Sequence, residues 1–174
     1  VSAVCDVSRE SAQQAAALCG AEVFADAAAL IAADTVDAVV VTTPGFAHTE
    51  PVLLAIAAGK PVFCEKPLAT TAADCKAIVQ AEMAAGQHLV QVGFMRRYDR
   101  GYNQVKALLD SGDFGKPLLV KCTHRAISVD DSYTTAMAVT DTAIHEIDVL
   151  QWLTGEAWAS VEVLSGRNTR HARQ

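Results

Sequence analysis

Long apolar runs and clusters of basic residues are both missing from this sequence. No apolar stretch approaches the ~18 residues that a membrane-spanning helix needs, so we expect no membrane span. The chain carries a formal net charge of -6, and no basic run interrupts that acidity. Because nucleic acids and acidic membrane surfaces attract basic proteins, we expect neither as the main partner.

Metal-binding and nucleophile motifs are missing as well. The sequence has no H-x-x-x-H, H-E-x-x-H or C-x-x-C spacing and no G-x-S-x-G elbow, so we expect neither a metal site nor a serine nucleophile. Its cysteines are odd in number and scattered, at Cys5, Cys19, Cys64, Cys75 and Cys122. Unpaired thiols in a reducing compartment are the simplest interpretation, which predicts a cytoplasmic protein.

The glycine-rich loop G-x-G-x-x-G, which binds the pyrophosphate of a dinucleotide at a helix N-terminus, is also absent. In a dinucleotide-binding sheet this loop would precede Val1. The chain also opens inside an apolar run and closes with a polar tail over residues 167–174. We therefore interpret the chain as a fragment that binds a dinucleotide poorly by itself.

Apolar, strand-like runs alternate with helical patterns in the first part of the chain. Strands are expected at Val1–Cys5, Ala21–Ala25, Val36–Thr43, Pro61–Cys64 and His88–Phe94. Helices are expected from Ser8 to Gly20, from Asp26 to Ala33, from Ala47 to Ala58 and from Thr71 to Ala85. This order predicts a Rossmann-type parallel α/β sheet with helices on both faces.

The regular alternation of strand-like runs and helical patterns ends after Phe94. The patterns predict a helix from Tyr98 to Ser111, a strand from Leu118 to His124, a helix from Thr140 to Leu153 and a strand from Trp158 to Leu164. We place a domain boundary near residue 94. The first domain, residues 1–94, is an incomplete α/β domain, and residues 95–174 are part of an α+β domain.

Several polar residues of the first domain follow strands, where ligands of open α/β sheets bind. Asp6 could accept both ribose hydroxyls of NAD or be a simple turn residue, while the nearby Arg9 leaves NADP open. Thr42 and Thr43 end the central strand. For His48, ligand contact and a capping or surface position are equally plausible.

The tripeptide Glu65-Lys66-Pro67 directly follows a predicted strand. At this place Lys66 would face the crevice above the sheet, where its ammonium could bind a substrate hydroxyl and stabilise a developing oxyanion. Composition alone favours a surface turn, so the interpretation depends on what else the chain contains.

A second set of candidates lies in the second domain. Asp141 and His145 are four residues apart in a predicted helix, which places both on one face. A neutral imidazole is a suitable base for an alcohol proton, although a capping Asp and a structural His are equally plausible. Arg96 and Arg97 follow a predicted strand, and we expect at most one of them to face a substrate. His124 ends a predicted strand and could reach a polyol hydroxyl, although a surface position is slightly favoured.

Taken together, these segments resemble the Gfo/Idh/MocA oxidoreductase family, and within it the inositol 2-dehydrogenases. The matching pieces are Val36 to His48, Gly59 to Ala69 with its core CEKPLA, QVGFMRRYD from Gln91 to Asp99, Gly115 to Arg125, and DTAIHEIDVLQWL from Asp141 to Leu153. The resemblance implies that NAD is the cofactor and that a ring alcohol of a small polyol, such as an inositol, is oxidised to a ketone. It also implies a homo-oligomer, a tetramer in this family.

The resemblance further implies a role for each matching residue. Lys66, Asp141 and His145 match the family's catalytic lysine, aspartate and histidine, and all three also bind substrate. Arg96 and His124 match positions of the inositol site. The cofactor positions are matched by Asp6, Thr42, Thr43, His48, Glu65 and Lys66.

Two departures from the family pattern keep alternatives open. Ala126 stands where the inositol enzymes carry a polyol-binding asparagine, and Ala136 stands where an acidic residue is usual. Losing a hydrogen-bonding group can shift substrate choice, which leaves a related sugar dehydrogenase as an alternative. A catalytically inactive binding module is the alternative from another class.

Overall fold

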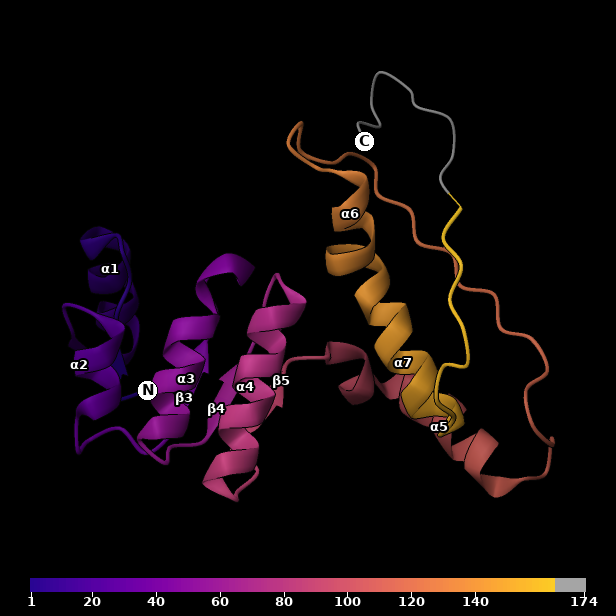
Figure 1. Ribbon diagram of the computed structural model, residues 1–174. Helices are drawn as coiled ribbons and strands as arrows, with labels where there is room; N and C mark the ends of the chain where they lie inside the picture. The colour runs from indigo at the N-terminus through magenta and orange to yellow at the C-terminus, as the bar shows by residue number, and fades with distance from the viewer. Residues whose placement is uncertain (165–174) are drawn as a thin grey trace. The chain divides into compact units, whose positions relative to one another are not determined.

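The computed structural model describes residues 1–164. Its backbone contacts divide the chain into two compact units, Val1–Gly93 and Phe94–Gln174. Figure 1 shows strands only in the first unit, whereas helices and long extended segments make up the described part of the second.

The first unit contains five short parallel strands in two sheets (Figure 1). Strands β1 (Ala3–Val4) and β2 (Glu22–Val23) form one pair, and β3 (Val39–Val41), β4 (Val62–Cys64) and β5 (Val90–Val92) form the other sheet in that order. All five predicted strands and their parallel direction are confirmed. The expectation of a single sheet is wrong, because no ladder of hydrogen bonds joins β1 or β2 to β3 within the described residues.

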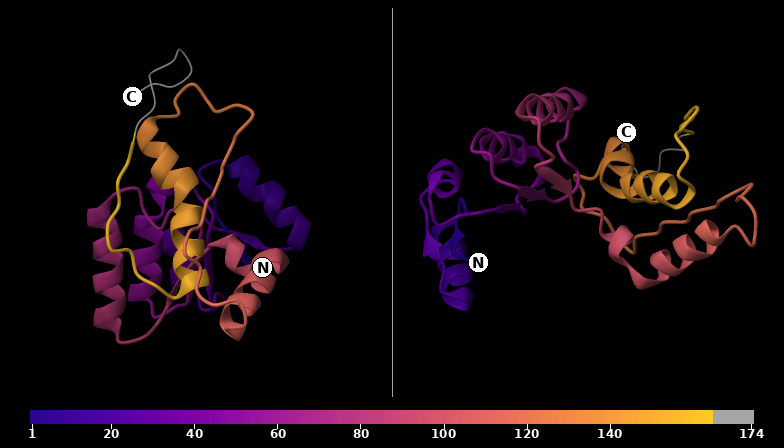
Figure 2. Two further views of the ribbon diagram at one scale, coloured as in Figure 1. Left: turned by 90° about the vertical axis from the view of Figure 1, so that its right-hand side faces the viewer. Right: turned by 90° about the horizontal axis from the view of Figure 1, so that it is seen from below.

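Helices α3 (Thr49–Ala57) and α4 (Ala72–Ala85) lie on the same face of the β3–β4–β5 sheet (Figure 2). Val39 and Val41 are buried beneath this layer, whereas Val40 points the other way and is 68% exposed. When successive parallel strands are added to a sheet on the same side, right-handed crossover connections place all the connecting helices on one face of that sheet. The expectation of helices on both faces is therefore wrong for this sheet.

Side-chain caps define where the helices of the first unit begin. Ser8 precedes α1 (Arg9–Cys19), and its hydroxyl accepts a hydrogen bond from the amide of Ser11 at 3.3 Å. Asp26 caps α2 (Ala27–Ala32) through the amide of Ala29 at 2.8 Å. Thr71 caps α4 in the same way. These caps confirm the predicted starts, because each satisfies an amide that has no partner within the helix.

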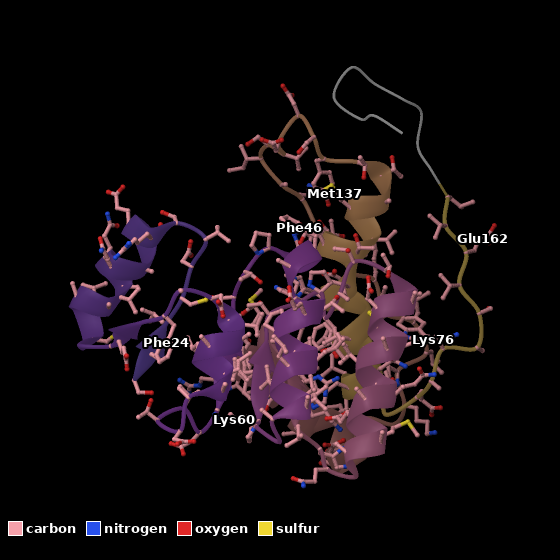
Figure 3. All side chains as sticks on the ribbon, turned by 60° about the vertical axis from the view of Figure 1, so that its left-hand side comes forward. Phe24, Phe46, Lys60, Lys76, Met137 and Glu162 are labelled. Atoms are coloured by element: carbon pink, nitrogen blue, oxygen red, sulfur yellow. The ribbon has the colours of Figure 1, made fainter. Side chains whose placement is uncertain are left out.

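The core of the first unit joins the β3–β4–β5 sheet to the helices that cover it. Its fully buried side chains include Val41, Val52, Val62, Cys64 and Ile78. Lys60, labelled in Figure 3, extends beneath this core, and its ammonium donates to the carbonyls of Ile31 and Ala33 at 2.6 and 2.7 Å. A charged side chain thus stabilises the C-terminal end of α2, where main-chain carbonyls are unpaired.

The regular secondary structure in the described part of the second unit consists of helices. The short 3-10 turn η2 (Met95–Tyr98) leads into α5 (Arg100–Ser111), whose N-cap is Asp99. A later helix consists of α6 (Thr135–Met137), a π-helical stretch η3 (Ala138–Ala143) and α7 (Ile144–Thr154) in direct succession (Figure 1).

The strands predicted at Leu118–His124 and Trp158–Leu164 are not formed; both segments are extended chain without ladder bonds. Alternating apolar residues favour a strand, but a strand exists only through hydrogen bonds to a neighbour. Among residues 94–164 neither segment has such a neighbour, and Leu118 is 100% exposed. The alternating apolar pattern is present in both segments, but residues 94–164 provide no neighbouring strand for either of them.

Candidate active site

The carboxyl ends of β3, β4 and β5 lie at one edge of their sheet. The register pairs Val41 with Cys64 and Cys64 with Val92, so the three strands end level with one another. The amide of Glu65 donates to the carbonyl of Val41 at 2.9 Å, which carries the pairing one residue further. The residues that follow these strands are therefore brought together, as ligand sites of parallel sheets require.

The Glu65-Lys66-Pro67 turn sits at this edge directly after β4, and its peptide bond between Lys66 and Pro67 is cis. Glu65 and Lys66 are half-buried rather than fully exposed. One oxygen of the Glu65 carboxylate accepts a hydrogen bond from the amide of Lys66 at 3.2 Å. The surface turn that composition favoured is thus replaced by a partly buried, internally bonded turn.

Gly93 shows how tightly this turn is packed. A Cβ at this position would meet the Phe63 ring at 3.0 Å and a carboxylate oxygen of Glu65 at 3.2 Å. Any larger residue at position 93 would therefore require the Phe63 ring and the Glu65 carboxylate to shift by a few tenths of an ångström. The need for glycine here was not recognised from the sequence, although a glycine near the end of the predicted strand His88–Phe94 was a signal of close packing.

His48 is the predicted site residue whose position differs most from expectation. It is 1% exposed, and its two ring nitrogens lie 2.7 Å from the main-chain carbonyl oxygens of Pro67 and Thr43. The surface position is therefore wrong, and His48 stands at the N-cap of α3 without a side-chain capping bond, while contact with a cofactor stays a prediction. Phe46, two residues earlier, points outward and is 77% exposed (Figure 3).

The remaining cofactor candidates of the first unit are exposed. Asp6 follows β1, and one of its carboxylate oxygens accepts a hydrogen bond from the amide of Ser8 at 2.7 Å, so it is at least a turn residue. Burial, aided by the charges of Asp26 and Asp6, raises the pKa of the neighbouring Cys5 thiol. Thr43 donates its hydroxyl to the carbonyl of Ala47 at 3.4 Å.

In the second unit, Asp141 and His145 occupy different kinds of helix. Asp141 is exposed in the π-helical stretch η3, whereas His145 is buried in the first turn of α7. A π-helix is wider than an α-helix, so the pair does not have purely α-helical geometry, and the placement of both side chains on one face stays a prediction. Such π segments are rare and occur frequently at functional sites.

Arg96 and His124 are brought together by Glu146. Arg96 donates to one carboxylate oxygen of Glu146 at 2.5 Å, and Nδ1 of His124 lies 3.5 Å from the same oxygen. The guanidinium of Arg96 also lies over the ring of Tyr102, 5.6 Å from its centre. Burial alone would raise the pKa of Glu146, but the hydrogen bond and charge of Arg96 outweigh it and lower that pKa.

Arg97, adjacent to Arg96, pairs instead with Asp148, which is buried on α7. The burial of Asp148 and its pairing with Arg97 indicate a structural role. The site residues thus fall into two sets: Lys66 and its neighbours belong to the first unit, and Asp141, His145, Arg96 and His124 to the second.

Within residues 1–164, no group of three or more His, Cys, Asp or Glu side chains could hold a metal ion. No helix in this part of the chain is both long and apolar enough to cross a membrane. An open groove in the first unit is lined by Phe46, Leu53, Leu54 and Asp74 among others, and none of the predicted site residues lines it.

Two family models match successive parts of this chain. Residues 1–94 match the Gfo/Idh/MocA family described as "Oxidoreductase family, NAD-binding Rossmann fold", and residues 102–174 match the GFO/IDH/MocA C-terminal domain. The chain is 54% identical over 173 residues to the inositol 2-dehydrogenase of Klebsiella pneumoniae, covering 98% of this chain and 51% of that protein. It is 58% identical over 153 residues to the inositol 2-dehydrogenase of Pseudomonas syringae, covering 88% of this chain and 46% of that protein.

A solved structure agrees with these relatives. The myo-inositol dehydrogenase of Lactobacillus casei, in complex with NAD(H) and myo-inositol, superposes with a TM-score of 0.84 at 43% identity, covering 89% of this chain and 46% of that one. The chain thus spans about half the length of the relatives it matches. By both of its matched segments, this chain belongs to the Gfo/Idh/MocA oxidoreductase family.

Proposed function

We propose that this chain carries part of the active site of an NAD-dependent inositol 2-dehydrogenase. The reaction oxidises a ring secondary alcohol of a polyol, myo-inositol or a related inositol, to a ketone. The observation that carries the proposal is the Glu65-Lys66-Pro67 turn, packed at the carboxyl edge of a parallel sheet beside Thr42 and Thr43. Relatives more than 50% identical that are named inositol 2-dehydrogenase support the substrate class.

In the proposed reaction, His145 takes the hydroxyl proton as the carbon–hydrogen bond of the alcohol breaks. Asp141 assists that proton transfer. Lys66 donates a hydrogen bond to the substrate oxygen and stabilises the negative charge that develops on it. NAD, when bound, accepts the hydride, so that the alcohol loses one proton and one hydride and becomes a ketone.

The first unit fits a nicotinamide cofactor in part. Exposed Asp6 follows β1 and exposed Thr42 and Thr43 follow β3, so polar groups stand at the carboxyl ends of two parallel strands. We assign cofactor contacts to these three residues, to Glu65 and to Lys66. Residues 1–174 contain no glycine-rich loop, so the pyrophosphate would need donors from outside them.

We assign Arg96 and His124 to the polyol side of the site. A guanidinium carries five N–H donors, and the bond to Glu146 uses one of them. Because Glu146 holds both Arg96 and His124, it presents a cation and an imidazole side by side to hydroxyl groups. Such a pair suits a ligand with several neighbouring hydroxyls.

One observation favours a second candidate, a sugar dehydrogenase of the same family. Ala126 has no side-chain donor or acceptor for a polyol hydroxyl, and sites that lose such a group change their substrate preference. We further propose a cytoplasmic homo-oligomer, a tetramer as the family resemblance implies. Its five cysteines, all free thiols, support a reducing compartment.

The test uses a chimaera in which residues 1–174 replace the matching residues of the K. pneumoniae relative, which supplies the length that this chain does not span. NADH formation is followed over a panel of inositols, glucose and other sugars, with NAD and with NADP. We expect turnover of an inositol with NAD. Turnover of sugars alone favours the second candidate, and a folded chimaera without turnover on any substrate contradicts both.

A further inference from the structure

His48 connects the ends of two neighbouring strands. It stands just before α3, and its buried ring reaches the carbonyl oxygen of Thr43 after β3 through Nε2 and that of Pro67 after β4 through Nδ1, both at 2.7 Å. A ring with one N–H donates to one of these carbonyls, and an imidazolium donates to both. Pro67 is the residue directly after Lys66.

Backbone packing supports the same connection. A Cβ at Gly45 would meet two ring carbons of Pro67 at 3.1 Å, so the turn before His48 already lies against the proline. On the other side of the turn, a Cβ at Gly93 would lie 3.2 Å from a carboxylate oxygen of Glu65. The residues on either side of Lys66 are therefore held from two directions, by the segments that follow β3 and β5.

We propose that His48 is a positioning residue for Lys66. It acts through the hydrogen bond between Nδ1 and the Pro67 carbonyl, which fixes the main chain that carries the lysine. This inference rests on the catalytic role proposed for Lys66. It replaces direct cofactor contact as the role of His48, because a ring that is 1% exposed has no surface to offer a cofactor.

Two substitutions separate the two hydrogen bonds of the ring. The amide nitrogen of asparagine reaches about the place of Nδ1, and that of glutamine reaches about the place of Nε2. His48→Asn can therefore keep the bond to Pro67, whereas His48→Gln can keep only the bond to Thr43. A residue that merely fills space would tolerate both changes or neither.

We expect His48→Gln to lower kcat on the order of 100-fold in the chimaera, because small displacements of a catalytic group cost about that much. We expect His48→Asn to have a kcat at least about tenfold higher than His48→Gln, and the KM for NAD to change by less than about threefold in both. His88→Asn and His88→Gln are matched controls at an exposed histidine and should leave kcat unchanged. Equal losses in the two His48 variants, or a glutamine variant that is more active than the asparagine variant, would overturn the proposal.

A readout without turnover keeps this test apart from the proposed function. Amide hydrogen exchange of the peptide covering residues 65–70 should be faster in His48→Gln than in His48→Asn, while the β5 peptide stays unchanged. If the chimaera oxidises no substrate, the proposed function fails. The hydrogen-exchange rates of residues 65–70 then decide by themselves whether His48 fixes the main chain at Pro67. If both His48 variants fail to fold, Gly45→Ala, which pushes on Pro67, should lower kcat with His48 intact; an unchanged kcat there overturns the proposal.

Discussion

Arg97 holds Asp148 through two hydrogen bonds between a guanidinium and a carboxylate: Nε donates to Oδ2 at 2.9 Å, and an Nη donates to Oδ1. Asp148 is buried on α7, three residues after His145, whereas the Arg97 side chain is 44% exposed. The hydrogen bond with Asp148 raises the pKa of Arg97. The pair ties η2 to the helix that carries the proposed base.

Removing the carboxylate of this pair should destabilise the fold. We expect Asp148→Asn to lower the free energy of unfolding by about 1–3 kcal/mol, less than for a fully buried pair because solvent screens Arg97. Urea denaturation measures the change. Lys116→Met breaks the exposed pair with Glu156 and should cost less than about 0.5 kcal/mol. Similar costs for the two variants would contradict a buried, structural Asp148.

Glu146 should make stability depend on pH in the acidic range. Its pKa in the folded protein lies below its ordinary value of 4.5, because Arg96 outweighs the effect of burial. A carboxyl of this kind stabilises the fold above its unfolded pKa, and the contribution is lost as pH falls through the folded pKa. The difference in stability between the protein and Glu146→Gln should therefore shrink as urea titrations move from neutral pH to below 4.5. Glu162→Gln, at an exposed position, is the control; a difference for Glu146→Gln that does not vary with pH would contradict the role of its charge.

Cys64 should be the least reactive thiol of the chain. Burial in β4, followed by the charge of Glu65, raises its pKa to about 12, and the thiolate is the reactive form. Cys19 and Cys122 are exposed and should react first with a thiol reagent at mildly alkaline pH. Mass spectrometry of labelled peptides should find Cys64 modified only after denaturant is added. Early labelling of Cys64 would show that β4 opens in the native protein.

Lys66 and His145 should each be needed for turnover. We expect Lys66→Ala and His145→Ala to lower kcat by at least about 100-fold in the chimaera, because each removes a group that acts on the reacting alcohol. NAD affinity, measured by fluorescence titration, should fall much less for His145→Ala. Lys76→Ala removes an exposed lysine of α4 and serves as the control (Figure 3). Near-normal turnover in either active-site variant would falsify its assigned role.

Local sequence signals predicted the first unit well. Ser8, Asp26 and Thr71 were identified as helix starts because their side chains accept amide hydrogen bonds from the next turn, a short-range effect. The five strands were found from apolar runs that end at polar or glycine residues. What these runs could not show was that, within the described residues, β1 and β2 pair only with each other, because pairing depends on residues distant in sequence.

The second unit shows where local signals fail. The apolar pattern of residues 118–124 predicted a strand, yet strand formation needs a neighbour that the described residues do not provide. The spacing of Asp141 and His145 predicted a regular α-helix, but Asp141 lies in the π-helical stretch η3. Neither the lack of a partner strand among the described residues nor the π-helical stretch η3 could be predicted from local residue type and spacing.

The sequence by itself determined the alternation of strands and helices, the family resemblance and the identity of Lys66, Asp141 and His145 as candidates, because these depend on residue type and spacing. Only the tertiary structure decided that His48 is an interior link between Thr43 and Pro67, and that Arg96 and His124 meet at Glu146. A histidine or arginine has several possible partners in a sequence. Folding selects among them, because a buried polar group must find a hydrogen-bond partner within reach.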